Sequence, residues 1–271
     1  MGLRVNTNVA SLTAQRNLHN VTSRLQGNFS RLSSGLRIST AADDAAGLGI
    51  SEKMRSQTRS YSVAARNAQD GISMAQTAEG ALNEVSNILG RMRELAMQAS
   101  NGTLSDTDRD VIDVEFQALD TEIQRISDET EFNGVTLLDT AGTAAIQVGI
   151  NSGDTIDINT VDVDSTALGT GTLDTQDVTN ANAALGTLDT AIGLVNTARG
   201  QLGSDQNRLS SALSSILNVR ENLSAAESRI RDVDVAAETA DLTRNSILQQ
   251  AATSVLGQAN VQPQLALSLL G

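Results

Sequence analysis

Residues 54–99 read MRSQTRSYSVAARNAQDGISMAQTAEGALNEVSNILGRMRELAMQA, and apolar or small side chains recur in them every seven residues. One row at this spacing contains Met54, Tyr61, Ala68, Ala75, Leu82, Leu89 and Ala96, and a second contains Ala64, Gly71, Ala78, Val85, Met92 and Ala99. Rows three and four residues apart share one helical face, and a strict seven-residue period is typical of helices that supercoil around a partner. The pattern predicts a helix over residues 52–99, a rod of roughly 70 Å.

Small residues occupy the middle of both rows. Ala68, Gly71, Ala75 and Ala78 would let a partner helix approach closely. A glycine inside a helix costs about 1 kcal/mol of helix propensity, so this helix must draw its stability from packing against other elements.

The same period returns in the second half of the chain. This row contains Leu188, Val195, Leu202, Leu209, Ile216, Leu223 and Ile230. Between the two long helices, Ser105 and Asp108 have the spacing of a helix N-cap, which predicts a shorter helix ending near residues 132–134. The middle of the chain therefore holds three helices.

A stretch without the seven-residue period separates the second and third of these helices. Residues 146–150 and 156–158 alternate apolar and polar side chains around Asn151-Ser-Gly-Asp154, which predicts a β-hairpin. The following residues, up to Gln176, are rich in Gly, Thr and Asp and predict a surface loop.

Both chain ends are helical patterns with an apolar face and no partner of their own. At the N-terminal end this face contains Leu18, Val21, Leu25, Phe29 and Leu32; toward the uncharged C-terminal tail it contains Ile247, Val255, Leu265, Leu269 and Leu270. The middle helices fold back on themselves, so the ends can pair antiparallel. Such a pair leaves an apolar surface wider than two helices can hide, and we expect further copies of the chain to cover it. These ten residues are the predicted polymerisation surface.

The fold class that follows is mainly α: a long antiparallel helical bundle or coiled coil with a small β-hairpin region and paired terminal helices. We expect two domains. Residues 1–42 and 232–271 form a domain of terminal helices, and residues 43–231 form the bundle, with the hairpin and loop at about 135–176.

Composition argues against several functions. The net charge of −13 is unsuited to nucleic acid or an anionic membrane surface. The chain has no cysteine, and its one histidine, His19, has no local partners with which to complete a zinc site or a catalytic triad. We expect no enzyme activity, no metal and no cofactor. We also expect no membrane span and no cleaved signal peptide, because the required apolar segments are missing.

Two groups of carboxylates remain to be explained. Asp43 and Asp44 are neighbours on the chain and do not face one another on a helix. A cluster of acids at the start of the shorter helix contains Asp106, Asp108, Asp110, Asp113 and Glu115. It could bind a cation, but a solvated helix start, favoured by the helix dipole, is the preferred interpretation.

Several longer stretches resemble bacterial flagellins. They are RLSSGLRI (31–38), DDAAG (43–47), ARNAQDGISMAQTAEGALNEV (65–85), RELAMQASNGT (93–103), FNG (132–134) and SVLGQANVQPQLALSLLG (254–271). The resemblance covers about residues 1–140 and 180–271. It implies a filament subunit whose terminal helices form an inner tube and whose bundle forms the outer wall. Because only a short segment lies between these regions, the resemblance also implies that the variable outer domains of other family members are absent.

The resemblance also implies partners and a location. The partners are further copies of the chain, an export chaperone on the C-terminal helix, and hook-associated and cap proteins. The location is the extracellular filament, reached by export without a cleaved signal. Two alternatives stay open: a hook–filament junction protein, which shares the terminal helices but does not propagate, and a secreted coiled-coil adhesin or effector. The ending LSLLG resembles flagellin more closely than either.

A last implication concerns a host receptor. Arg91, Leu95 and Glu115 match positions by which similar flagellins are bound by the vertebrate flagellin-sensing Toll-like receptor. Arg91 and Leu95 are four residues apart, so we expect them on one exposed face, with Glu115 beside them if the two helices are antiparallel. The sequence departs from receptor-active relatives at Gly90, where they carry glutamine. Subunit contacts in the filament are the alternative role for this face.

Overall fold

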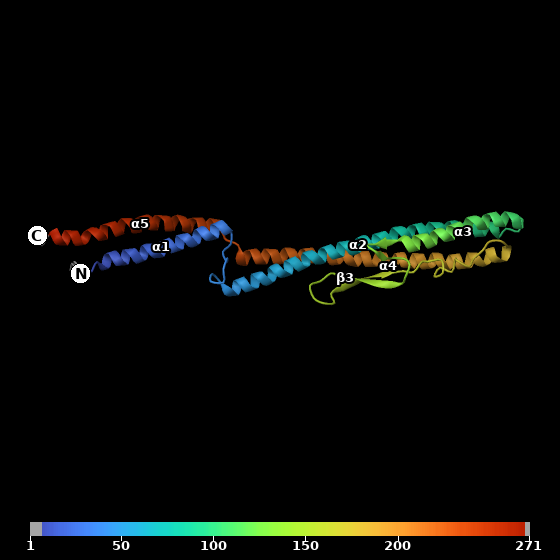
Figure 1. Ribbon diagram of the computed structural model, residues 1–271, viewed down its shortest axis with the longest axis horizontal. Helices are drawn as coiled ribbons and strands as arrows, with labels where there is room; N and C mark the ends of the chain where they lie inside the picture. The colour runs from blue at the N-terminus through green and yellow to red at the C-terminus, as the bar shows by residue number, and fades with distance from the viewer. Residues whose placement is uncertain (1–6, 269–271) are drawn as a thin grey trace. The chain divides into compact units, whose positions relative to one another are not determined.

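The computed structural model describes residues 7–268, and the side chains of residues 7–262 (Figure 1). Its elements are α1 (Val9–Ser34), α2 (Ala45–Ala99), α3 (Asp106–Glu129), β1 (Glu131–Phe132), β2 (Val135–Thr136), β3 (Gly142–Gln147), β4 (Thr155–Thr160), α4 (Val178–Arg231) and α5 (Val235–Ser268). The predicted fold class, a mainly helical protein with a small β-hairpin region, is confirmed.

The chain divides into two compact units. The first contains residues 1–56 and 222–271, and the second contains residues 57–221. Both divisions fall inside long helices, α2 and α4, whereas the domain boundaries expected from the sequence fall at the breaks between helices. Each unit is described by itself below.

The second unit is built around the faces that the seven-residue rows predict. α2, α3 and α4 pack around one core, in which Leu82, Leu89, Phe116, Leu188 and Val195 are fully buried. Side-chain contacts show that α4 runs antiparallel to α2. Arg93 Nε donates to Asp189 Oδ1 at 2.6 Å, and Gln206 Nε2, further along α4, donates to Glu79 Oε2, earlier on α2, at 2.9 Å.

Three elements of this unit meet at Gly71 of α2. A Cβ atom at this glycine would lie 3.1 Å from Ile146 Cγ1 of β3 and 3.3 Å from Leu209 Cδ1 of α4. These separations are shorter than ordinary van der Waals contact, so the missing side chain lets both neighbours approach α2. The small residues on either side, Ala68 and Ala75, are fully buried. The predicted close approach is confirmed.

The predicted hairpin is present and its register pairs Ile146 with Ile156. Its turn is held by Asp154, whose carboxylate accepts from the backbone N–H and the side-chain amide of Asn151 at 3.1 and 3.0 Å. A second, smaller hairpin joins β1 and β2. Its turn residues Asn133 and Gly134 have φ angles of 51° and 80°, the left-handed conformation of a tight hairpin turn. Because this hairpin begins at Glu131, α3 ends at Glu129, a few residues before the end near 132–134 that the sequence predicted.

The segment after the hairpin is more buried than the surface loop predicted for it. Val163 and Leu168 are 1% and 4% exposed and pack into the core. The buried Asp113 of α3 accepts from the Thr175 backbone N–H at 2.8 Å and from Gln176 Nε2 at 3.1 Å. Apolar residues spaced irregularly among glycines and threonines carry no periodic signal, which is why the sequence did not reveal this packing.

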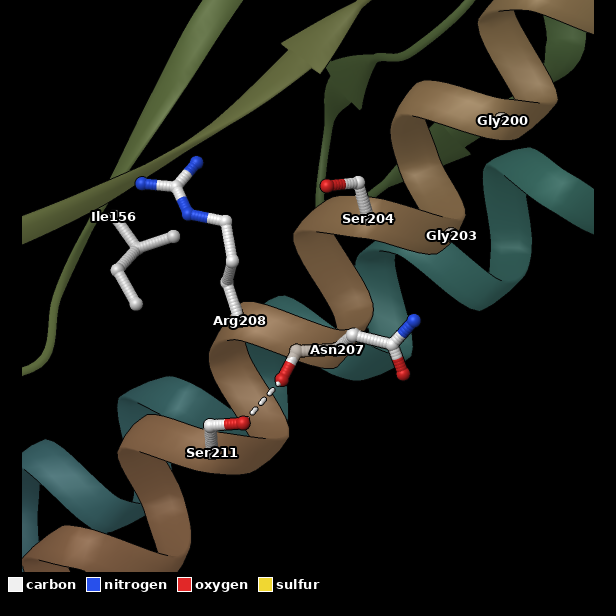
Figure 2. A pocket seen from close by; sticks show the side chains of 7 residues that line it. All are labelled: Ile156, Gly200, Gly203, Ser204, Asn207, Arg208 and Ser211. Atoms are coloured by element: carbon white, nitrogen blue, oxygen red, sulfur yellow. Dashed lines mark hydrogen bonds between the residues drawn. The ribbon is translucent and has the colours of Figure 1, made fainter.

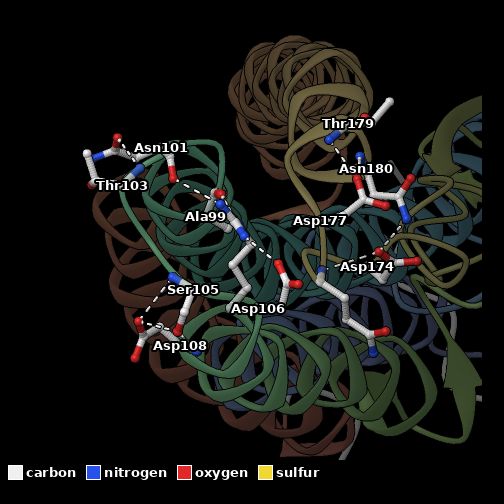
Figure 3. Close-up of polar contacts among 12 residues, drawn as sticks. Ala99, Asn101, Thr103, Ser105, Asp106, Asp108, Asp174, Asp177, Thr179 and Asn180 are labelled. Atoms are coloured by element: carbon white, nitrogen blue, oxygen red, sulfur yellow. Dashed lines mark hydrogen bonds and ion pairs between the residues drawn. The ribbon is translucent and has the colours of Figure 1, made fainter.

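The corner between α2 and α3 uses side chains to complete two helix ends (Figure 3). Ser105 and Asp108 form the predicted capping box at the start of α3. Arg109, 5% exposed, donates through Nε to the Ala99 carbonyl at 3.0 Å. The last carbonyl groups of α2 lack helical partners, so this buried guanidinium satisfies one of them.

In the first unit, α1 and α5 lie side by side and antiparallel (Figure 1). The two segments that lead into them are joined by backbone hydrogen bonds, because Arg37 N–H donates to the Arg231 carbonyl at 2.7 Å and Val233 N–H donates to the Gly35 carbonyl at 3.0 Å. Arg231 also contacts Glu52, with 2.9 Å between NH1 and Oε1. The terminal helices therefore leave these segments together.

Candidate assembly surface

The contact between α1 and α5 follows a seven-residue pattern on both helices. The α1 side contains Ser11, Ala14, Leu18, Val21, Leu25, Asn28 and Leu32, and the α5 side contains Glu238, Leu242, Asn245, Gln249, Ala252, Leu256 and Ala259. All of them are buried or half-buried. We call these fourteen residues the seam. Eight of these side chains are small or polar, and the other six are Leu or Val.

The structure separates the N-terminal half of the predicted polymerisation surface into two groups. Leu18, Val21, Leu25 and Leu32 lie in the seam and are half-buried against α5 of the same chain. Phe29 points away from it and is 55% exposed. The apolar face read from the sequence is therefore largely the contact between the two terminal helices.

The C-terminal half behaves differently. Ile247 and Val255 are 60% and 57% exposed. The side chain of Leu265 lies beyond the described side chains, and Leu269 and Leu270 lie outside the described residues. Ala240, seven residues before Ile247, and Ala251, four residues after it, are exposed too.

One continuous face of α5 carries four exposed large apolar residues. Leu248 and Val255 are seven residues apart, and Ile247 and Val261 are fourteen apart, so each pair lies on one row along the helix. Leu248 is 44% exposed and Val261 is 47% exposed. We call Ile247, Leu248, Val255 and Val261 the outer face of α5. The seven-residue spacing from Leu248 to Val255 was the sequence signal that could have located it.

The residues predicted for receptor recognition are only partly brought together. Arg91 of α2 donates through Nε and NH2 to Glu115 Oε1 of α3, both at 2.9 Å, and through NH1 to Glu94 at 3.0 Å. The hydrogen bonds that Arg91 donates to Glu115, and then to Glu94, raise the pKa of its guanidinium. The pairing of Arg91 with Glu115 agrees with the antiparallel arrangement expected.

Leu95 does not project beside Arg91, and the expectation that it is exposed is wrong. Its side chain is 2% exposed and belongs to the core of the second unit. The physical reason is that α2 packs against both α3 and α4, which buries a wider face than a single partner helix would.

Four of the five members of the acidic cluster at the start of α3 have separate partners. Asp106 pairs with Arg109 at 2.8 Å, and Asp108 accepts from the backbone N–H and the hydroxyl of Ser105. Glu115 pairs with Arg91, and Asp113 accepts from the loop above it. Within the described part of the chain, no group of three His, Asp or Glu side chains could hold a metal ion.

A hollow lies over α4 (Figure 2). Its lining residues are Ile156, Gly200, Gly203, Ser204, Asn207, Arg208 and Ser211. The Ser211 hydroxyl donates to the Asn207 carbonyl of its own helix at 2.9 Å. The hollow is a surface depression formed by small side chains. None of the described helices combines the length and apolar character that a membrane crossing needs.

Known protein families match both ends of the chain. Residues 5–143 match the bacterial flagellin N-terminal helical region, and residues 185–270 match the bacterial flagellin C-terminal helical region. The chain belongs to the bacterial flagellin family. Its two matched regions contain all five described helices, apart from the first turns of α4.

Individual flagellins are similar over their whole length. The chain is 49% identical over 269 residues to flagellin from Halalkalibacterium halodurans, covering 98% of this chain and 99% of that protein. It is 45% identical over 304 residues to flagellin from Bacillus subtilis, covering 99% of this chain and 100% of that protein. As a flagellin, the chain is a structural subunit of the bacterial flagellar filament, which self-assembles from copies of one protein.

Solved structures agree with this family. Flagellin from Bacillus cereus matches with a TM-score of 0.52 and 41% identity over 56% of this chain and 88% of that one. A putative flagellar hook-associated protein from Vibrio parahaemolyticus matches with a TM-score of 0.60 over 70% of this chain and 100% of that one, but at 16% identity. That second likeness shows a shared fold alone.

Proposed function

We propose that this flagellin assembles into the filament through the outer face of α5, which neighbouring copies bury. The observation that supports the proposal is the exposure of four large apolar side chains on one face of a helix whose other face is already paired with α1. Fully burying such a side chain contributes about 1.5–3 kcal/mol. Four of them repeated in every subunit would favour a polymer strongly, and they have no comparable benefit in a free chain.

The proposal predicts that a charge on the outer face stops growth. Val255→Asp would place an unpaired carboxylate in the subunit contact, at a cost of at least about 3 kcal/mol, and raise the concentration needed for elongation more than about a hundredfold. Asn196→Asp is the matched control, because it adds the same charge at an exposed position of α4. The measurement is elongation of sheared filament seeds by turbidity and negative-stain microscopy.

Two outcomes would contradict this proposal. One is normal elongation by Val255→Asp, and the other is equal inhibition by Asn196→Asp. The parent chain itself separates a filament subunit from a junction protein, since a junction protein would bind seeds without lengthening them. A coiled-coil adhesin or effector would not bind them at all.

We further propose that an export chaperone covers α5 before assembly and that the chain leaves the cell without cleavage of a signal. Its support is the same exposed face, because an uncovered apolar strip invites aggregation inside the cell. Hook-associated and cap proteins at the growing tip would then contact α1 and α5 while these two helices pair. No enzymatic step is part of this function.

We also propose that the unassembled chain is bound by the vertebrate flagellin-sensing Toll-like receptor through Arg91 and Glu115. The exposed ion pair between them supports this assignment, with both side chains 48% exposed. Leu95 is buried, so it would contribute indirectly, by packing α2 against the core of the second unit. Gly90 leaves open space beside the pair, since a Cβ atom there would meet nothing within 4 Å. Neighbouring subunits would compete for the same face, so binding is expected for the free chain and not for the filament.

A further inference from the structure

Two asparagines stand in the seam at positions where a helix pair usually places apolar side chains. Asn28 is 8% exposed and Asn245 is 9% exposed. Asn245 Nδ2 donates to Asn28 Oδ1 at 3.3 Å. Along α1, Asn28 follows Val21 and Leu25 at intervals of seven and three residues, so it shares their heptad face. The pair is therefore a buried amide contact between two seam positions, next to a hollow lined mostly by polar and charged side chains.

Polar contacts near the start of α1 fit the same antiparallel alignment of α1 with α5. Asn8 Nδ2 donates to the Ala259 carbonyl at 2.7 Å, and Ser11 Oγ donates to Asn260 Oδ1 at 2.7 Å. From these contacts to the asparagine pair, residue numbers rise along α1 to Asn28 and fall along α5 to Asn245. All of these contacts consequently belong to one antiparallel register.

We propose that Asn28 and Asn245 are positioning residues that set the register of α1 against α5 for assembly. The apolar part of the seam repeats every seven residues, so it discriminates weakly against a slip of one heptad. A slip in either direction would place Asn245 opposite Val21 or Gly35 instead of Asn28. A buried amide left without a partner costs more than a formed hydrogen bond contributes, so the amide pair disfavours both slipped registers.

Register matters because it places the outer face of α5. A slip of one heptad would move α5 by roughly 10 Å along α1. Each subunit of a regular filament must present its outer face at the same height, so a mixture of registers would disrupt the lattice. This inference rests on the proposed role of the helix pair in assembly.

Engineered cysteine pairs can report the register, because the parent sequence contains no cysteine. Ser11→Cys with Asn260→Cys reports the native register, since these side chains are in contact. Ser11→Cys with Thr253→Cys reports a slip of one heptad in one direction, and Leu18→Cys with Asn260→Cys reports a slip in the other. Each pair is built into the parent and into the double variant Asn28→Leu, Asn245→Leu.

The reporters are read in filaments. Each is added as a minority to parent chains during seeded growth, so that a variant that elongates poorly by itself still enters the filament. Mild oxidation is followed by non-reducing electrophoresis, which separates cross-links within one chain from cross-links between chains. Elongation of the parent tests the proposed assembly, and the ratio of slipped to native cross-link tests the register inference separately.

We expect only the native cross-link in the parent and a rise of roughly tenfold in the slipped-to-native ratio in the double leucine variant. Gln249→Leu, also in the seam, is the matched control and should keep the native register. Asn28→Leu alone should elongate less well than the double variant, because it leaves the Asn245 amide buried without its partner. The inference is overturned if the double variant keeps the parent ratio or if Gln249→Leu slips equally.

Discussion

At the scale of single residues, Gly71 and Gly80 of α2 have different surroundings, and we expect substitution at each to affect stability differently. A Cβ atom at Gly71 would press on Ile146 and Leu209, whereas one at Gly80 would meet nothing within 4 Å. We expect Gly80→Ala to stabilise the protein by about 1 kcal/mol through helix propensity. Gly71→Ala should gain the same propensity but lose most or all of it to crowding. Urea denaturation of the two variants measures the difference, and an equal gain at both sites would refute this account.

A second prediction at this scale concerns Arg91. Arg91→Ala should weaken receptor binding of the free chain by at least about 1 kcal/mol, as expected for an interface arginine. Arg93→Ala is the matched control: it removes the same charge from the same helix, but its partner is Asp189 of α4. Dose–response curves on receptor-bearing cells give the comparison. An unchanged response to Arg91→Ala would rule out the assignment, and so would an active filament that releases no free chain.

At the scale of an element, the N-terminus of α3 depends on pH. Hydrogen bonds from the Ser105 hydroxyl and backbone N–H hold the pKa of Asp108 below the ordinary value of an aspartate. A lowered folded pKa means that the capping interaction stabilises the protein above the unfolded pKa and is lost as the pH falls through the folded value. The stability difference between the parent and Ser105→Ala should therefore shrink from about pH 5 to about pH 3.

Ser100→Ala provides the control for this pH dependence. The Ser100 hydroxyl donates to the Met97 carbonyl at 2.8 Å, a contact without a titratable group. The stability difference that it produces should stay constant over the same pH range, as measured by urea denaturation. If the effect of Ser105→Ala is equally large at both pH values, ionised Asp108 is not what stabilises the cap.

At the scale of the whole molecule, the two units differ in what they bury. The second unit has an extensive core, whereas the buried hydrophobic residues in the described part of the first are Ala14, Ile38 and Ala259. In the free chain, backbone amides of α1 and α5 should therefore exchange with solvent much faster than those of the core helices α2 and α4. Mass spectrometry of exchanged peptides tests this. Equal protection throughout would contradict it, and added export chaperone should slow exchange in α5 if our second proposal holds.

Much of this architecture could be predicted from local sequence patterns. The seven-residue rows predicted the helical core faces of α2 and α4, Ser105 with Asp108 predicted the start of α3, and residues 146–158 predicted the hairpin. These predictions succeeded because periodicity, capping and turn chemistry act between residues close together in the chain. The flagellin motifs, which are long and specific, likewise pointed to the family that the comparisons confirm.

The tertiary structure decided which of several possible faces each helix buries. The described part of the C-terminal face predicted from the sequence, Ile247 and Val255, is exposed, whereas the seam passes through Leu242 and Asn245. Leu95 is buried because α2 has two neighbours. An amide is compatible with a buried position only when a distant partner satisfies it, and Asn28 lies 217 residues from Asn245. Burial depends on the number and chemistry of such distant neighbours, which local periodicity does not contain.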